Sequence, residues 1–370
     1  MTKARDLADL GNKTSLDEIN DAYDAGALSN RNIIINGAMQ VAQRGTSATG
    51  VNSNGYYATD RMNFYKTNSA TYAISQSTDA PAGFSYSHKV VSTTGDSSLG
   101  ATDLVSPLFY SIEGQDLQHL GYGTTDGKYS TLSFWVKTNV TGTYSVSFYK
   151  THLSARVCSP LYTITTANTW QYVSLTVPSD TVSIANGTGG GLYLYFNTTV
   201  GSSYNSQPTT AWTAYNSNNW AGGHTANCFA SSNDSWQITG VQLELGDTAT
   251  PFEHRSYGQE LALCQRYFQV LGNNQSNGAI ASGYFHSSTS VRVQMSYLQR
   301  MRAAPSGSTS TVSGFILQDT GGNLTPTSIA VVVNHTDALL IVGVGPARTT
   351  GTGANLLSSS GTAIYLDAEL

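Results

Sequence analysis

Charged residues are scarce in this chain. Asp, Glu, Lys and Arg make up 11% of its 370 residues, against about 25% in ordinary soluble domains. The formal net charge is −5 and no run of Lys or Arg stands out. The sequence therefore lacks the basic patch that is typical of nucleic-acid binding, and we expect no nucleic-acid partner.

Cysteine, proline and long apolar runs are also few. The three cysteines, Cys158, Cys228 and Cys264, do not suit a disulfide scaffold and are predicted to be small buried residues. No apolar run approaches the roughly 20 residues of a membrane span. The first residues show no apolar signal-peptide core, so we expect a protein made in a cytoplasm, without membrane insertion.

Small polar residues and tyrosine replace the missing charge. The chain has 36 Gly and 22 Tyr. Tyr and Thr favour strands, whereas Gly, Asn and Ser favour turns. Hydrophobic residues still account for 39%, which is enough to bury a core and argues against disorder. The composition predicts an all-β protein with a polar but largely uncharged surface.

Predicted strands follow one another from residue 31 to 253. In 132–137 and 144–148 every second residue is apolar, which is the pattern of a half-buried strand. Turns rich in Gly, Asn, Ser and Asp separate the strands. This series predicts a jelly-roll-like β-sandwich over 31–253, with residues 31–43 as its first strand.

Two helical segments flank the predicted sandwich. In residues 1–30, Ser15 and Glu18 form a capping-box pattern, and a helix this short needs a partner surface. We expect 1–30 to be an N-terminal attachment segment. Ser256 with Gln259 repeats the capping pattern and starts a linking helix within 254–272.

Residues 273–370 are predicted to form a smaller C-terminal β domain. Its runs Ile329–Val333 and Leu339–Val344 are continuously apolar, which indicates strands buried on both faces. A domain of only about 100 residues buries both faces of a strand most readily by self-association, so we expect this domain to be oligomerising.

The densest cluster of ionisable groups lies between residues 240 and 268, and it contains Glu244, Asp247, Glu253, His254, Arg255, Glu260 and Arg266. Two carboxylates could flank a glycosidic bond, but a locally paired cluster at a domain joint explains the pattern as well. No phosphate-binding loop, nucleophile elbow or zinc-spaced ligand set accompanies it. We predict no enzymatic activity, no catalytic residue, no metal site and no cofactor.

A polar segment at 202–224 favours binding over catalysis. It carries four aromatic residues among small polar ones: Tyr204, Trp212, Tyr215 and Trp220. Flat rings stack on the C–H faces of sugars, and long ordered loops are usually functional. These four residues are the candidate glycan-binding site. The alternative is that the rings fold back and pack as a local core.

Several segments resemble a known family. "WQITGVQLELGDTATPFEHRSYGQELALCQRYF" at 236–268 is similar to a segment that recurs in tail-fibre and other virion appendage proteins of tailed bacteriophages, notably marine and cyanobacterial ones. "NRNIIINGAMQVAQRGTS" followed by "GYYATDRMNFYK" resembles the opening of those proteins. "MRAAPSG" at 301–307 and the ending "IYLDAEL" resemble later parts, in the same order.

The resemblance implies a homotrimeric virion protein with a sandwich like that of carbohydrate-binding modules. Such a protein attaches to a host surface glycan, and residues 1–30 would bind other virion proteins of the tail, adaptor or baseplate. The family motif transfers no catalytic residue. The N-terminal region has no long fibre shaft, so a compact appendage and a fibre carried by an adaptor are both open. Other readings are a capsid-surface or purely structural fibre, and a glycan-cleaving tailspike, although the repeats of a β-helix are not found.

Overall fold

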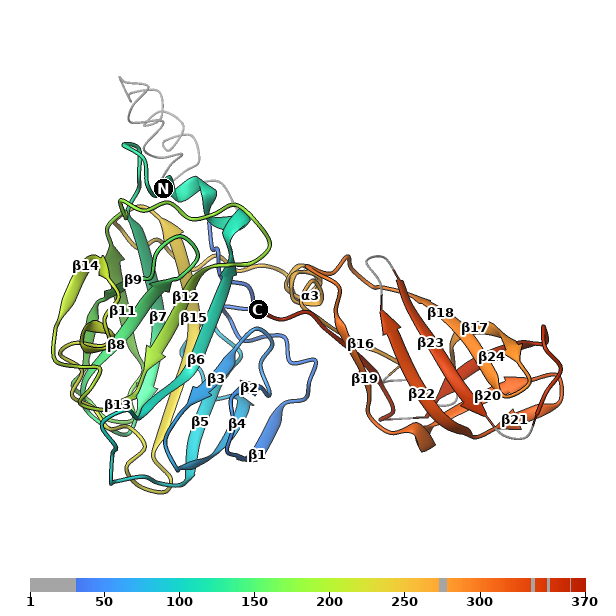
Figure 1. Ribbon diagram of the computed structural model, residues 1–370. Coiled ribbons are helices and arrows are strands. Elements are labelled where there is room, and N and C mark those ends of the chain that lie inside the picture. Colours follow the sequence, from blue (N-terminus) through green and yellow to red (C-terminus); the bar gives the residue numbers. More distant parts are fainter. Residues whose placement is uncertain (1–30, 273–277, 334–336, 345–346, 360) are drawn as a thin grey trace, which may run out of the picture. The chain divides into compact units, whose positions relative to one another are not determined.

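The structure, a computed structural model, describes residues 31–272, 278–333, 337–344, 347–359 and 361–370. The chain divides into two compact units, with the boundary between Arg255 and Ser256. Both units consist of antiparallel β-sheets (Figure 1), which confirms the all-β prediction. The predicted N-terminal helix at 1–30 lies outside the described residues.

The first unit is a sandwich of two sheets (Figure 1). The six-stranded sheet has the order β1-β4-β5-β15-β7-β11, with bounds Ser47–Val51, Thr71–Ser77, Ser87–Thr94, Ser235–Leu245, Ser130–Thr138 and Gln171–Val177. The nine-stranded sheet has the path β14-β9-β8-β12-β6-β3-β2, with bounds Thr209–Ala214, Arg156–Ser159, Gly142–Lys150, Gly190–Asn197, Leu104–Glu113, Asn63–Lys66 and Gly55–Tyr56. Beside that path, β10 (Leu161–Ile164) pairs with β8, and β13 (Thr199–Val200) pairs with β6. A 3₁₀ turn, η1 (Gly114–Leu120), follows β6.

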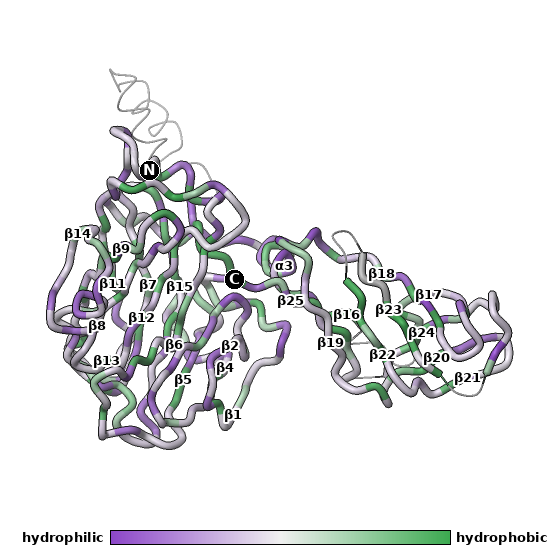
Figure 2. The backbone as a smooth tube through the Cα atoms, viewed as in Figure 1, coloured by the Kyte–Doolittle hydropathy of each residue, from purple (hydrophilic) through white to green (hydrophobic). Residues whose placement is uncertain are grey.

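Alternation along the strands builds the core between the two sheets. On β7, Leu132, Phe134 and Val136 are fully buried, whereas Trp135 and Lys137 are partly exposed. Because successive side chains of a strand point to opposite faces, each sheet turns one face inward and one outward. Along the strands of both units, hydrophobic and polar residues follow one another, as the changing colours of the tube show (Figure 2).

The strand predicted at 31–43 is not formed, and β1 begins only at Ser47. Asn36 and Met39 have φ values of 61° and 57°, which lie in the left-handed region that a strand cannot contain. The Asn36 side chain closes a local loop instead, because its Oδ1 accepts from Val41 N and its Nδ2 donates to Val41 O, each at 2.9 Å. The apolar residues Ile34, Met39 and Val41 of this segment are still buried. The strand prediction was wrong because it rested on apolarity alone, which does not determine the backbone conformation.

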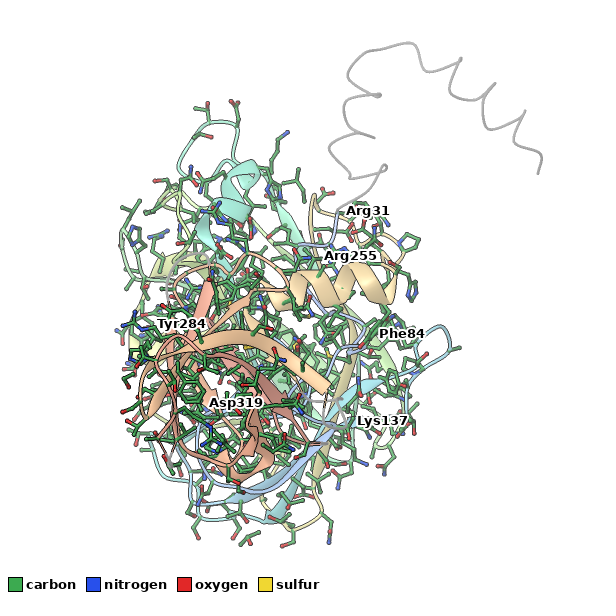
Figure 3. All side chains as sticks on the ribbon, turned by 90° about the vertical axis from the view of Figure 1, so that its right-hand side faces the viewer. Arg31, Phe84, Lys137, Arg255, Tyr284 and Asp319 are labelled. Atoms are coloured by element: carbon green, nitrogen blue, oxygen red, sulfur yellow. The ribbon has the colours of Figure 1, made fainter. Side chains whose placement is uncertain are left out.

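The charge cluster at the end of β15 fastens the following segment to the sandwich. Glu244 Oε1 accepts from Thr250 N at 2.9 Å, and Glu253 Oε2 accepts from Asn32 N at 2.8 Å. Arg255 donates to the carbonyl oxygens of residues 32 and 34, and Arg31 Nη2 donates to Pro251 O at 3.0 Å (Figure 3). These charged groups therefore make internal structural contacts.

The second unit begins with helix α3 (Tyr257–Gln265). Ser256 caps it, and the Ser256 and Gln259 side chains complete the predicted capping box. A three-stranded sheet follows in the order β16-β25-β19, with bounds Phe268–Leu271, Ile364–Asp367 and Ser306–Thr309. A seven-stranded sheet has the order β21-β20-β24-β17-β18-β23-β22, with bounds Gly322–Leu324, Phe315–Asp319, Gly353–Ser358, Gly278–Ser287, Ser290–Ser296, Asp337–Val344 and Pro326–Val333. A 3₁₀ turn, η3 (Val312–Gly314), precedes β20.

The apolar runs of the second unit are not buried on both faces within one chain. Strand β22 is the last of its sheet. On it, Ile329, Val331 and Val333 are half-buried, whereas Ala330 and Val332 are exposed, Val332 to 45%. The second face of β22 is therefore open to solvent in the isolated chain.

Two further observations concern the cysteines and the helices of the described residues. The three cysteines are buried and free, as predicted. No described helix has the length and apolarity to cross a membrane.

Candidate functional site

Aromatic rings gather on the outer face of the nine-stranded sheet. On β12, Tyr193 and Tyr195 are partly exposed, while the residues between and beside them belong to the core. The same alternation leaves Tyr65 of β3, Phe109 of β6 and Tyr149 of β8 partly exposed. Because the sheet order is β8-β12-β6-β3, these rings from distant parts of the sequence become neighbours.

Tyr195 stands at the centre of this group. Its ring is stacked on Phe109 at 4.3 Å between centroids, and its edge contacts Tyr65 at 5.8 Å. Trp220 meets the rings of Tyr195 and Tyr149 at 4.7 and 5.2 Å, both in edge-to-face geometry. Each such pair contributes about 0.5–1.5 kcal/mol beyond the area it buries, so the rings hold one another in place.

The segment between β13 and β14, together with the residues after β14, supplies a wall beside these rings. Ala221 N donates to Tyr204 O at 2.8 Å, which joins the two ends of the wall. The 3₁₀ turn η2 (Ser217–Asn219) is capped by Asn216 and leads into Trp220. Gly222 permits the close packing, because a Cβ at this position would lie 2.0 Å from Gln207 O.

The sheet and the wall enclose a hollow of about 170 Å³, which we call the aromatic hollow. It is lined by Tyr65, Leu104, Tyr149, Tyr195, Tyr204, Tyr215 and Trp220. Tyr215 is 37% exposed and Trp220 only 6%. The lining thus consists of aromatic rings and one aliphatic side chain, and none of these residues carries a charge.

A buried polar network holds Trp220 in the aromatic hollow. Its indole Nε1 donates to Asn197 Oδ1 at 3.3 Å, and its carbonyl oxygen accepts from Ser147 Oγ at 2.6 Å. Asn197 Nδ2 donates to Ser147 Oγ at 2.7 Å and to Ser145 Oγ at 3.0 Å. Ser106 Oγ donates to Asn197 Oδ1 at 3.0 Å. Trp220 is therefore fixed before any ligand arrives.

The tyrosine hydroxyls of the aromatic hollow are available to a ligand. Within the described part of the chain, none of the five lining tyrosines uses its hydroxyl in a hydrogen bond to protein. Elsewhere the chain does satisfy such groups: the hydroxyls of Tyr72 and Tyr144 donate to Asn68 Oδ1 and Val140 O.

Burial raises the pKa of four of the five lining tyrosines. Desolvation raises the pKa of Tyr65, Tyr149, Tyr195 and Tyr215 above the ordinary value, and neighbouring tyrosines raise it further. Each hydroxyl therefore keeps its proton at neutral pH, and a phenol in that state both donates and accepts a hydrogen bond.

The structure brings three of the four sequence-predicted residues together and separates the fourth. Tyr204, Tyr215 and Trp220 line the aromatic hollow. Trp212 lies on β14, is 8% exposed and belongs to the main core, where its Nε1 donates to Pro178 O at 2.9 Å. Its ring packs against Tyr122 at 5.9 Å.

Charged groups also hold Trp212 in the core. The ammonium of Lys150 lies 5.3 Å from the Trp212 ring centroid and forms an ion pair with Asp180 at 2.7 Å. Arg156 pairs with the same carboxylate at 2.7 Å and donates to Trp212 O at 3.0 Å. Trp212 therefore packs in the main core.

Trp220 is also buried, in a small hydrophobic cluster with Leu104 and Ala221 against which Tyr204 packs. The packing alternative therefore holds for both tryptophans, although Trp220 also lines the aromatic hollow.

Sequence reasoning missed the strand-borne half of the aromatic hollow. Tyr65, Tyr149 and Tyr195 each lie on a strand, at positions that alternate with core residues. Because these tyrosines alternate with core residues, the sequence indicates that they lie on the solvent-facing side of their strands. Their convergence on one spot was not readable, because it depends on which strands become neighbours in the sheet.

No protein-family model and no curated protein matches this chain. Among solved structures, the enzymatically active domain of tailspike protein 4 from bacteriophage CBA120 is similar at 16% identity and a TM-score of 0.30, covering 58% of this chain and only 21% of that one. A proposed sugar-binding protein from Bacteroides thetaiotaomicron is similar at 10% identity and a TM-score of 0.28, covering 58% of this chain and 100% of that one. The family 11 carbohydrate-binding module of a cellulosomal cellulase from Clostridium thermocellum is similar at 10% identity and a TM-score of 0.27, covering 56% of this chain and 98% of that one. Similarities at these TM-scores do not support a function, so the function must be argued from the residues of the site.

Proposed function

We propose that this protein binds a bacterial surface glycan through the aromatic hollow. The observation that carries the proposal is a depression in which six aromatic rings meet and five phenol hydroxyls make no hydrogen bond to any described residue of the protein. Rings of this kind pack against the C–H faces of a sugar, and the hydroxyls exchange hydrogen bonds with its O–H groups. Binding sites combine the same two elements: apolar and aromatic walls, and a few convergent polar groups.

Binding without turnover fits this site better than hydrolysis does. Glycoside cleavage generally uses two carboxyl groups on either side of the scissile bond, and the lining of the aromatic hollow contains none. Glu244 and Glu253, the pair considered from the sequence, accept hydrogen bonds from Thr250 and Asn32 instead. We therefore propose a non-enzymatic protein. Release of reducing ends from a bound polysaccharide by the pure protein would contradict this.

The biological setting that we propose is a virion appendage of a tailed bacteriophage, such as a tail fibre. The support is the sequence resemblance at 236–268, at 30–47 and 55–66, at 301–307 and at 364–370. In this setting residues 1–30 attach the protein to the tail, an adaptor or the baseplate. Deleting 1–30 should leave folding intact and abolish incorporation into particles. Microscopy of particles would distinguish a tail fibre from the runner-up, a capsid-surface or purely structural fibre.

Weak single sites suit such an appendage. A ring stack contributes about 0.5–1.5 kcal/mol beyond its buried area, and a dissociation constant of about 1 mM corresponds to only about 4 kcal/mol. A homotrimer, as proposed for this chain, presents three copies. Linked sites raise the apparent affinity by a factor of about 10² or more when they can be reached together, so weak monovalent binding and firm attachment are compatible.

The direct test uses an array of bacterial surface polysaccharides probed with the full-length protein. Replacing both Tyr149 and Tyr215 by Ala should abolish binding to whichever polysaccharide the unaltered protein retains. Tyr172→Ala is the matched control, since Tyr172 is a 45% exposed tyrosine of the six-stranded sheet. Equal binding by all three proteins, or no binding by any, would overturn the proposal.

A further inference from the structure

We infer that the aromatic hollow accepts a single neutral sugar ring, in preference to an acidic, phosphorylated or amino sugar. The inference rests on the proposed glycan-binding function and specifies the chemical class of its ligand. It follows from the charge, the hydrogen-bonding capacity and the size of the aromatic hollow.

The aromatic hollow offers no counter-ion for a charged sugar. Its lining has no Lys, Arg, His, Asp or Glu. The two cations nearest in sequence to its tyrosines belong to the opposite face of their strands. Lys66 follows Tyr65, and its Nζ donates to Ala70 O at 2.5 Å. Lys150 follows Tyr149 and is paired with Asp180 inside the sandwich.

A carboxylate or phosphate in the aromatic hollow would lose water without gaining a positive partner. Removing a charge from water is unfavourable unless it is paired and hydrogen-bonded. A hydroxyl avoids this penalty, since it can donate to one phenol and accept from the next. Five lining phenols that both donate and accept therefore match an uncharged ring that carries several hydroxyls.

A quaternary ammonium group is the strongest competing ligand. Aromatic cages bind such cations through the faces of their rings, and choline would fit that chemistry. However, a cage of this type has no use for hydroxyl groups without partners. The five unpaired hydroxyls therefore favour a polyhydroxylated ligand, and choline becomes an arm of the test.

The size of the aromatic hollow limits the ligand to one ring. Its volume of about 170 Å³ is below the roughly 300–1,000 Å³ of sites for drug-sized molecules. A chain end or a one-residue side branch of a surface glycan presents a single ring in this way.

The experiment is saturation-transfer NMR with full-length protein and defined small molecules. The neutral probes are the methyl glycosides of glucose, galactose, mannose and N-acetylglucosamine. The charged probes are methyl glucuronide, methyl galacturonide and methyl glucosaminide, and choline is added separately. Each probe is titrated against the unaltered protein, Tyr215→Ala and Tyr172→Ala.

At least one neutral glycoside should bind, lose its signal in Tyr215→Ala and keep it in Tyr172→Ala. Each charged probe should bind at least tenfold more weakly than this neutral glycoside. A charged glycoside or choline that binds as tightly, and still depends on Tyr215, would overturn the neutral-ring inference and leave a ligand site at the aromatic hollow in place. If no probe binds in a manner that depends on Tyr215, both the inference and the proposed glycan binding fail.

Discussion

Nε1 of Trp220 donates a hydrogen bond to Oδ1 of Asn197 at 3.3 Å, which ties the least exposed ring of the aromatic hollow to the sheet beneath it. Asn197 is itself fully buried and contacts three serines. The position of the Trp220 ring and the stability of the nine-stranded sheet therefore both depend on the side chain of Asn197.

Asn197→Ala should lower both stability and ligand binding. The change leaves the Trp220 indole N–H without its acceptor and removes the partner of Ser106, and each buried polar group left unsatisfied costs about 1–3 kcal/mol. We expect the free energy of unfolding, measured by urea denaturation, to fall by about 2–4 kcal/mol. Ser106→Ala is the control, with a loss near 1 kcal/mol or less. Equal losses for the two variants would show that the Asn197 amide has no special role.

Trp212→Ala should behave as a core mutation. The ring is 8% exposed and packs against Tyr122 and the ammonium group of Lys150, and truncating a buried aromatic side chain costs about 3–5 kcal/mol. Tyr215→Ala, at a 37% exposed position of the aromatic hollow, removes ring contacts with Tyr149 and Trp220. It should cost less, about 1–3 kcal/mol. Thermal denaturation of the two variants measures the difference. A stable Trp212→Ala protein that has lost glycan binding would restore Trp212 to the site.

Two buried histidines should make the sandwich unstable in mild acid. Desolvation lowers the pKa of His88 and of His224 from 6.5 to about 4. Between these values the unfolded chain binds protons that the folded chain excludes. The free energy of unfolding therefore keeps its full value above pH 6.5. It decreases as the pH falls from 6.5 to 4, by up to about 3 kcal/mol for each histidine.

Urea denaturation at pH 7.0, 5.5 and 4.5 measures this loss. His224→Gln provides the control, because glutamine keeps polar contacts without titrating in this range. The slope of unfolding free energy against pH should be smaller in His224→Gln than in the unaltered protein. An identical slope in the two proteins would assign the acid sensitivity to other groups.

The exposed face of β22 should mediate self-association. Val332 is 45% exposed on the last strand of the seven-stranded sheet, and a lysine on an edge strand opposes pairing with another chain. We expect light scattering to give a trimer for the unaltered protein and a monomer for Val332→Lys. Leu298→Lys, at a 53% exposed position of the same unit, is the control and should stay trimeric. A monomeric unaltered protein at micromolar concentration would disprove the association.

Local periodicity was enough to predict many strands. The segments 132–137 and 144–148, which were predicted as strands, lie within β7 and β8, because alternation of apolar residues is a property of each segment alone. The capping box at Ser256 was readable for the same reason. The run at 31–43 was misread, since the left-handed conformations of Asn36 and Met39 leave no trace in hydropathy.

About half of the candidate site could be predicted from the sequence. Tyr204, Tyr215 and Trp220 attracted notice because they interrupt a polar segment. Trp212 shared that context, yet it lies within β14, and its inward direction depends on pairing with β9, which sequence reasoning did not predict. The strand tyrosines were visible only as alternating positions. Their meeting required the order of strands in the sheet.

The residues that line the aromatic hollow come from two parts of the chain, which folding constrains to different degrees. Tyr65, Tyr149 and Tyr195 belong to strands whose other face forms the core, so their segments are constrained by folding. Tyr204 and Tyr215 belong to irregular backbone on either side of β14, where substitutions and insertions are tolerated far better. Substitutions in the wall alone could therefore change which sugar is recognised in the course of evolution. The stability of the sandwich would be little affected by them.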